Sequence, residues 1–173
     1  IILEKFLSPC DGSTIATANG NITVGNVSAA QDLTTSFADV TGSSITYTPP
    51  TGATQVIYEF HFYNSGDSDA NSLISQKLFL AGNEVDHANR SYYNVNDYDN
   101  GTGNILTWAF NIGGTATNNV GRVASWTSGK EIKLQAREHS SSYDSRYHAY
   151  RYWAGSDSDP VLAMPLIGIT AIG

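Results

Sequence analysis

The sequence predicts an all-β protein built as an antiparallel β-sandwich, with a jelly roll as the expected connectivity. Short runs rich in β-branched and aromatic residues alternate with turns rich in Gly, Asn, Asp and Pro. No stretch has a convincing amphipathic helical pattern. Strands that follow one another without helical crossovers favour antiparallel sheets over a parallel α/β fold. The 173 residues fit one domain of this size class.

The clearest strand covers residues 54–64. Its residues alternate with period two, so Val56, Tyr58, Phe60 and Phe62 share one apolar face. The other expected strands cover residues 21–27, 35–40, 44–48, 75–81, 83–87, 105–112, 123–127, 130–139 and 161–172.

One local connection is also predicted. Residues 35–40 and 44–48 flank the turn sequence Thr41-Gly42-Ser43. Two β-rich runs around a short Gly-containing turn are typical of a hairpin, so these two strands are expected to pair with each other.

Composition and charge limit the classes of partner. The net charge is −7, and the nine basic residues are scattered along the chain, whereas a nucleic-acid surface needs clustered Lys and Arg. No apolar run reaches membrane-spanning length, so no membrane insertion is expected. Nucleic acid and the bilayer are therefore not predicted partners.

Signals of catalysis or cofactor binding are weak. The chain has no Gly-x-Ser-x-Gly, His-Glu-x-x-His or phosphate-loop motif, and its lone Cys10 allows no internal disulfide. We expect no catalytic residue, no cofactor and no metal bound by the four histidines. Calcium is the one ion considered, because carboxylates alternate in three places, Asp67/Asp69, Asp97/Asp99 and Asp157/Asp159.

Two strands carry a second face that mixes apolar and charged groups, a composition typical of a protein interface. If residues 54–64 and 130–139 lie in one sheet, Glu59 is expected to pair with Lys133 or Arg137 along a symmetry axis. Ordinary cross-strand charge pairing on an exposed face is the alternative. The predicted interface residues are Ile57, Glu59, His61, Tyr63, Lys133, Arg137 and His139.

Two segments dense in aromatic and polar residues, 90–100 and 143–153, suggest contact with a carbohydrate. Aromatic rings stack on sugars, while Asn, Asp and Arg bond to hydroxyl groups. The alternative is that these aromatics pack loops onto the sandwich or onto an adjacent subunit. The candidate glycan contacts are Tyr92, Tyr93, Asp97, Tyr98, Tyr147 and Trp153.

Several segments resemble known virion proteins. Residues 33–49 (LTTSFADVTGSSITYTP), residues 55–60 (QVIYEF) and residues 165–172 (PLIGITAI) resemble phage virion proteins whose jelly roll is like that of tumour necrosis factor and C1q. Residues 3–13 and 121–127 resemble small structural proteins of marine bacteriophages.

This resemblance implies a homotrimer packed around a threefold axis on the virion surface, without catalytic residues. Residues 33–173 would form the jelly roll. Residues 1–32, which hold few large apolar groups, would form an N-terminal arm that docks on the major capsid protein or another virion protein. A capsid decoration protein is the expected role. The alternative is a tail-fibre or spike tip that binds a host-surface glycan, or a free carbohydrate-binding module.

Overall fold

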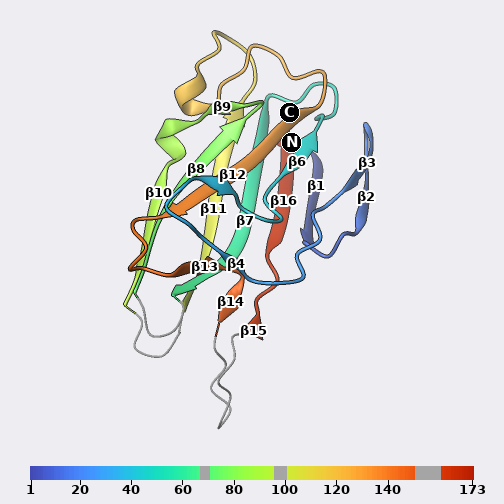
Figure 1. Ribbon diagram of the computed structural model, residues 1–173. Coiled ribbons are helices and arrows are strands. Elements are labelled where there is room, and N and C mark those ends of the chain that lie inside the picture. Colours follow the sequence, from blue (N-terminus) through green and yellow to red (C-terminus); the bar gives the residue numbers. More distant parts are fainter. Residues whose placement is uncertain (67–70, 96–100, 151–160) are drawn as a thin grey trace.

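The computed structural model describes residues 1–66, 71–95, 101–150 and 161–173, and these form an all-β sandwich of two antiparallel sheets (Figure 1). The helical elements among them are two short 3-10 turns, η1 (Asp86–Ala88) and η2 (Asn118–Val120). None of the helices in the described ranges has the length and apolar character needed to cross a bilayer. The predicted fold class is confirmed at the level of an antiparallel β-sandwich.

The first sheet is organised around β7, the longest strand. Phe60 of β7 pairs with Leu106 of β11 on one side and with Ile167 of β16 on the other, and β1 follows beyond β16. Farther along β7, the short strand β13 takes the place of β16 and carries β4 on its far side. The strands are β1 (Ile2–Pro9), β16 (Leu166–Ile172), β7 (Gln55–Gly66), β11 (Gly101–Asn111), β13 (Ser145–Tyr147) and β4 (Gln31–Asp32).

The second sheet has β8 and β12 at its centre. Strand β10 lies beside β8 at one edge, and β5 and β6 lie beside β12 at the other. Its strands are β10 (Arg90–Asn94), β8 (Ser72–Leu80), β9 (Asn83–Glu84), β12 (Lys130–Glu138), β5 (Ala38–Asp39) and β6 (Ile45–Tyr47). Two separate hairpins complete the fold, β2 (Thr14–Thr17) with β3 (Gly20–Thr23) and β14 (Ala149–Tyr150) with β15 (Val161–Leu162).

The core lies between the sheets and follows the predicted alternation. Val56, Tyr58, Phe60 and Phe62 are all buried on the inner face of β7. Each buried side chain of this size contributes roughly 1.5–3 kcal/mol through the hydrophobic effect. The hydroxyl of Tyr58 donates to the carbonyl of Ser43 at 2.8 Å, which satisfies its polar end inside the core.

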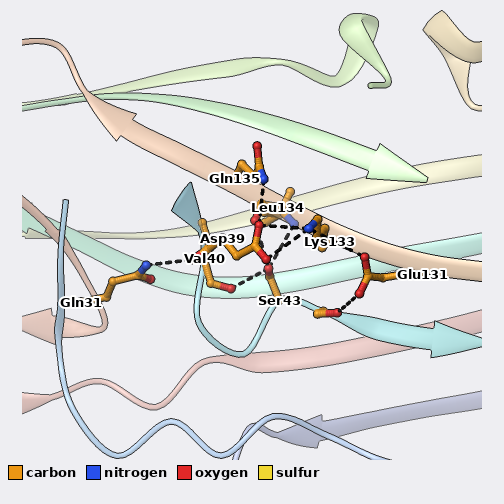
Figure 2. A network of polar contacts seen from close by, with 9 residues as sticks. Gln31, Asp39, Val40, Ser43, Glu131, Lys133, Leu134 and Gln135 are labelled. Atoms are coloured by element: carbon orange, nitrogen blue, oxygen red, sulfur yellow. Dashed lines mark hydrogen bonds and ion pairs between the residues drawn. The ribbon is translucent and has the colours of Figure 1, made fainter. Parts of the chain in front are cut away.

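The hairpin expected around residues 41–43 is wrong. Strands β5 and β6 do not pair with each other, because both pair with β12 and follow one another along its edge. Ser43 holds this arrangement: its hydroxyl donates to Val40 O at 2.7 Å and accepts from the backbone N–H of Leu134 at 3.0 Å (Figure 2). In this turn the chain leaves the edge of β12 and returns to it in the same direction, so no hairpin forms.

Gly42 makes this turn possible. Its φ of +83° is in the left-handed region, which favours glycine. An added Cβ would lie 2.7 Å from a methyl group of Val27 and 3.2 Å from Cβ of Cys10. The close approach ties the N-terminal segment to the edge of the second sheet.

Residues 1–32 contribute to the sandwich in this chain. Strand β1, which was not among the expected strands, pairs with β16 from Glu4 to Pro9, and Cys10, Val24 and Val27 are buried in the core. The segment was expected to be an extended arm because it holds few large apolar groups, yet small buried side chains are enough to anchor it. Docking of residues 1–32 on another protein stays a prediction.

Two further expectations differ from the structure. Residues 90–94, expected as part of a loop, form strand β10, because Tyr92 turns inward against the core while its neighbours face out. Residues 123–127 form no strand, and Val123 makes a single parallel bridge with Ile112.

Candidate functional site

The candidate site is the outer face of the first sheet, formed by β1, β16, β7 and β11. Residues directly opposite one another in an antiparallel pair share a face. His61 of β7 lies between Ile105 of β11 and Leu166 of β16, and all three face away from the core. Ile57 lies in the same way between strands β11 and β16. The register therefore builds one continuous surface across four strands.

This outer face is unusually apolar for a surface. Ile105 is 60% exposed and Leu7 is 48% exposed, although both are large aliphatic side chains. Extended apolar patches of this kind on soluble proteins usually mark interaction surfaces. The exposed large apolar residues on and beside this face are Ile1, Ile2, Leu3, Leu7, Ile105 and Met164.

A groove of about 380 Å³ opens on the same face, where β11 approaches the segment before β16. Its walls include Tyr63, Ile105, Met164 and Leu166, with His61 at one side. The hydroxyl of Tyr63 donates to the carbonyl of Gly101 at 2.8 Å, which holds the ring against β11. The face therefore offers a hollow with mostly apolar walls as well as a flat apolar area.

Glu59 and His61 are the charged and titratable groups in the middle of the face. Nε2 of His61 lies 3.2 Å from a carboxylate oxygen of Glu59, and both side chains are about 30% exposed. Gly168 lies opposite Glu59, and an added Cβ there would come within 3.0 Å of the Glu59 and Leu7 side chains. Glycine at this position lets the neighbouring side chains close over β16.

The structure brings together only part of the predicted interface. Ile57, Glu59, His61 and Tyr63 lie in one row on the outer face of the first sheet, half buried by their neighbours. Lys133, Arg137 and His139 belong to the second sheet or its edge, whose outer face points the opposite way.

The predicted pairing of Glu59 with Lys133 or Arg137 is therefore wrong within the chain, because β7 and β12 lie in different sheets. Lys133 pairs instead with Asp39 at 3.1 Å and with Glu131 at 3.8 Å (Figure 2). Hydrogen bonds from Gln135 and from Lys133 hold the pKa of Asp39 below its usual value. For Lys133 the structure matches the alternative of ordinary cross-strand pairing.

The candidate glycan contacts also separate. Tyr147 is fully buried and its hydroxyl donates to Gln76 at 2.8 Å, so the prediction that it touches a ligand is wrong: its strand packs inside the sandwich. Tyr92 is half buried, with its ring edge against Phe62. Tyr93 is 57% exposed. Asp97, Tyr98 and Trp153 lie outside the described residues.

The described residues contain no group of three or more His, Cys, Asp or Glu placed to hold a metal ion. The three Asp-x-Asp pairs considered for calcium lie outside these residues. Cys10 is buried, and burial together with the nearby Asp11 charge raises the pKa of its thiol to about 12. Such a thiol is protonated at neutral pH and is a poor nucleophile.

Strand β1 and residues Ile105, Met164 and Leu166 were missed as parts of the candidate site. For β1 a signal was present, because Leu3, Lys5 and Leu7 alternate with Glu4 and Phe6. Nothing in the local pattern shows that β1 lies next to β16. The pairing of β1 with β16 brings the two ends of the chain together. The amino group of Ile1 donates a hydrogen bond to Gly173 O at 2.8 Å.

Comparisons with known proteins identify no family. No protein-family model matches the chain, and no curated protein matches it in sequence. Among solved structures, a chain of infectious bursal disease virus, Gx strain, is similar over 96% of this chain and 32% of its own length, with 12% identity and a TM-score of 0.41. A chain of the Gt strain is similar over 92% of this chain and 46% of its own length, with 9% identity and a TM-score of 0.28. The chain thus spans less than half the length of either virus chain.

Proposed function

We propose that this chain is a non-catalytic structural protein of a virus particle, a capsid decoration protein that acts as a homotrimer. The observation that carries the proposal is the apolar outer face of the first sheet. A lone subunit would leave Leu7 and Ile105 in water, whereas packing this face against other copies would bury them.

The order of the strands supports a jelly roll. Along the chain β1 is in the first sheet, β6 in the second, β7 in the first, β8 and β10 in the second, β11 in the first, β12 in the second and β16 in the first. Main strands that alternate in this way between two packed antiparallel sheets are typical of a jelly roll. The resemblance of residues 33–49 and 55–60 to phage virion proteins points to the same fold and to trimers.

The few polar groups on the face are compatible with burial between subunits. Glu59 already has a partner in His61, so an interface would not take an unpaired carboxylate out of water. Lys5 of β1 lies in register with Thr170 of β16 on the same face, where it adds one positive charge. An interface that is apolar at its centre, with a small paired polar group, resembles those of stable homo-oligomers.

The β2–β3 hairpin supports contact with a second virion protein. It pairs with neither main sheet and stands beside β1 at the edge of the sandwich (Figure 1). The hairpin belongs to residues 1–32, the segment predicted to dock on the major capsid protein. The resemblance supports a virion-surface location, and the hairpin, whose Ile15 and Ile22 pack against the core, presents its other side at the edge of the sandwich.

The oligomer is tested by sedimentation equilibrium on the full chain and on Leu7→Glu and Ile105→Glu. Both side chains are exposed in the subunit, so a charge there leaves the fold intact but opposes burial between copies. Val95→Glu is the matched control, because Val95 is 66% exposed near the end of β10, away from this face. A trimer that dissociates in Leu7→Glu and Ile105→Glu but persists in Val95→Glu supports the proposal. A monomeric parent chain contradicts it.

The virion role is tested by immunogold electron microscopy of virus particles from the source culture. Label spread over the head supports a decoration protein. Label at fibre ends replaces that role with the fibre-tip alternative, and particles without label overturn the virion assignment.

A further inference from the structure

The outer face of the second sheet carries a separate concentration of positive charge. Arg137 of β12 lies in register with Ser75 of β8, which in turn lies in register with Ser91 of β10. Lys77 is two residues from Ser75 on the same strand and so shares this face. Two small serines beside these long cationic side chains leave a hollow between them.

An exposed phenylalanine holds two of the cations in place. Nζ of Lys77 lies 4.6 Å from the ring centre of Phe37, and the guanidinium carbon of Arg137 lies 5.8 Å from it. Phe37 is 37% exposed. Cation–π contacts of this kind position a charge while leaving it in reach of solvent and ligands.

The charges around the hollow are only partly neutralised. Lys77 pairs with Glu84 at 3.2 Å. Within the described ranges no carboxylate pairs with Arg90 or Arg137, whose guanidinium groups donate to backbone carbonyls only. Lys133, farther along β12, is by contrast neutralised by Asp39 and Glu131 (Figure 2). Arg137 lies on this outer face, whereas Arg90 is in register with the buried Gln76 and lines the groove from the exposed edge of the sheet.

The hollow is a groove of about 330 Å³, a volume at the lower end of the range of small-molecule sites. Besides the cations, its lining supplies hydroxyl and amide groups. Tyr93, 57% exposed, follows Ser91 on the same face by two residues and adds an aromatic ring beside the groove. The lining residues are Phe37, Ser75, Gln76, Lys77, Asn89, Arg90 and Ser91.

We propose that this groove, the Phe37 groove, binds a carboxylate-bearing sugar, such as a uronic acid unit of a polysaccharide. Arg90 lines the groove and Arg137 lies beside it against Phe37, and both supply charged donors in the planar geometry that suits a carboxylate. Ser75, Ser91 and Asn89 supply donors and acceptors for ring hydroxyls. An acidic peptide fits less well, because the groove floor offers side-chain hydroxyls, whereas extended peptides use strand edges or apolar pockets.

The site is independent of the proposed trimer. The Phe37 groove lies on the second sheet, and the apolar face proposed as the subunit interface lies on the first. The two faces point away from each other, so the groove stays open when the first sheet is covered.

The test is isothermal titration calorimetry on the full chain with oligogalacturonate, with dextran as a neutral polysaccharide and with poly-glutamate as an acidic peptide. We expect oligogalacturonate to bind, and Arg137→Gln and Arg90→Gln each to weaken binding by about tenfold. Ser91→Leu fills the groove without changing the charge and is expected to weaken binding similarly. Lys133→Gln is the matched control: it removes one charge from the same face and is expected to change affinity less than twofold.

Melting temperature and sedimentation of each variant confirm that the fold and oligomer are unchanged. If the chain binds poly-glutamate more tightly than oligogalacturonate, the assignment of the ligand as a sugar is overturned. Undiminished binding by Arg137→Gln and Ser91→Leu overturns the site, and an absence of binding to either polyanion overturns the proposal. A monomeric chain that binds oligogalacturonate contradicts the proposed trimer and leaves the groove standing.

Discussion

Nε2 of His61 lies 3.2 Å from a carboxylate oxygen of Glu59, in the middle of an apolar sheet face. Removing one member of a desolvated pair costs more than replacing both with apolar groups. We therefore expect His61→Leu to weaken the trimer and the double variant Glu59→Leu/His61→Leu to restore it. The coupling energy should be roughly 0.5–3 kcal/mol, measured by sedimentation in a double-mutant cycle. A trimer that associates as tightly in the single and double variants as in the parent chain would place the pair outside the interface.

His148 makes stability depend on pH. It is fully buried, its Nε2 lies 2.9 Å from Thr41 O, and its buried Nδ1 has no hydrogen-bond partner among the described residues. A second proton would therefore add a buried charge and an unsatisfied donor, and burial lowers the pKa of His148 from 6.5 to about 4.

Because the unfolded chain binds this proton more readily, the free energy of unfolding should fall as pH falls from about 6.5 to 4. The loss should approach about 3 kcal/mol at the lower end. Urea unfolding at intervals between pH 4 and 8 measures it, and His148→Gln should flatten this part of the curve. The same slope in the variant would assign the effect to other groups.

Gly168 should not tolerate a side chain. In addition to the contacts with Glu59 and Leu7, its added Cβ would lie 3.1 Å from the backbone oxygen of Phe6, which cannot turn aside. Gly168→Ala is expected to lower the free energy of unfolding by about 1–3 kcal/mol. Gly103→Ala on β11 is the control, because its nearest neighbour would be Tyr63 at 3.8 Å. Chemical denaturation that shows equal losses for the two variants would contradict this packing.

Tyr147 and Tyr93 should respond in opposite ways to substitution. Tyr147→Phe removes the buried hydrogen bond to Gln76 and is expected to cost about 1–3 kcal/mol of stability, without direct loss of sugar contacts. Tyr93→Ala removes an exposed ring and should leave stability within about 0.5 kcal/mol while weakening oligogalacturonate binding. Thermal unfolding and calorimetry on the same samples separate the two roles.

The fold class followed from local patterns. The alternation of Val56, Tyr58, Phe60 and Phe62 predicts a half-buried strand without knowledge of its neighbours, because side chains of a strand point alternately to opposite faces. The same reasoning found β8, β11, β12 and β16 to within a few residues, except that β11 begins earlier and β16 later than expected. Hydrophobic period and turn residues are local quantities, so a single sequence contains them.

Which strands share a sheet was decided by the tertiary structure. A mixed strand face looks the same in sequence whether Glu59 and Arg137 lie on one sheet or on opposite faces of a sandwich. Likewise, the pattern around Tyr147 does not distinguish an exposed aromatic loop from a core strand whose hydroxyl bonds to Gln76. The sequence by itself determined an antiparallel β-sandwich and an interface-like face on β7. Long-range pairing, which depends on contacts between residues far apart in the chain, determined that this face and the cationic groove lie on opposite sides.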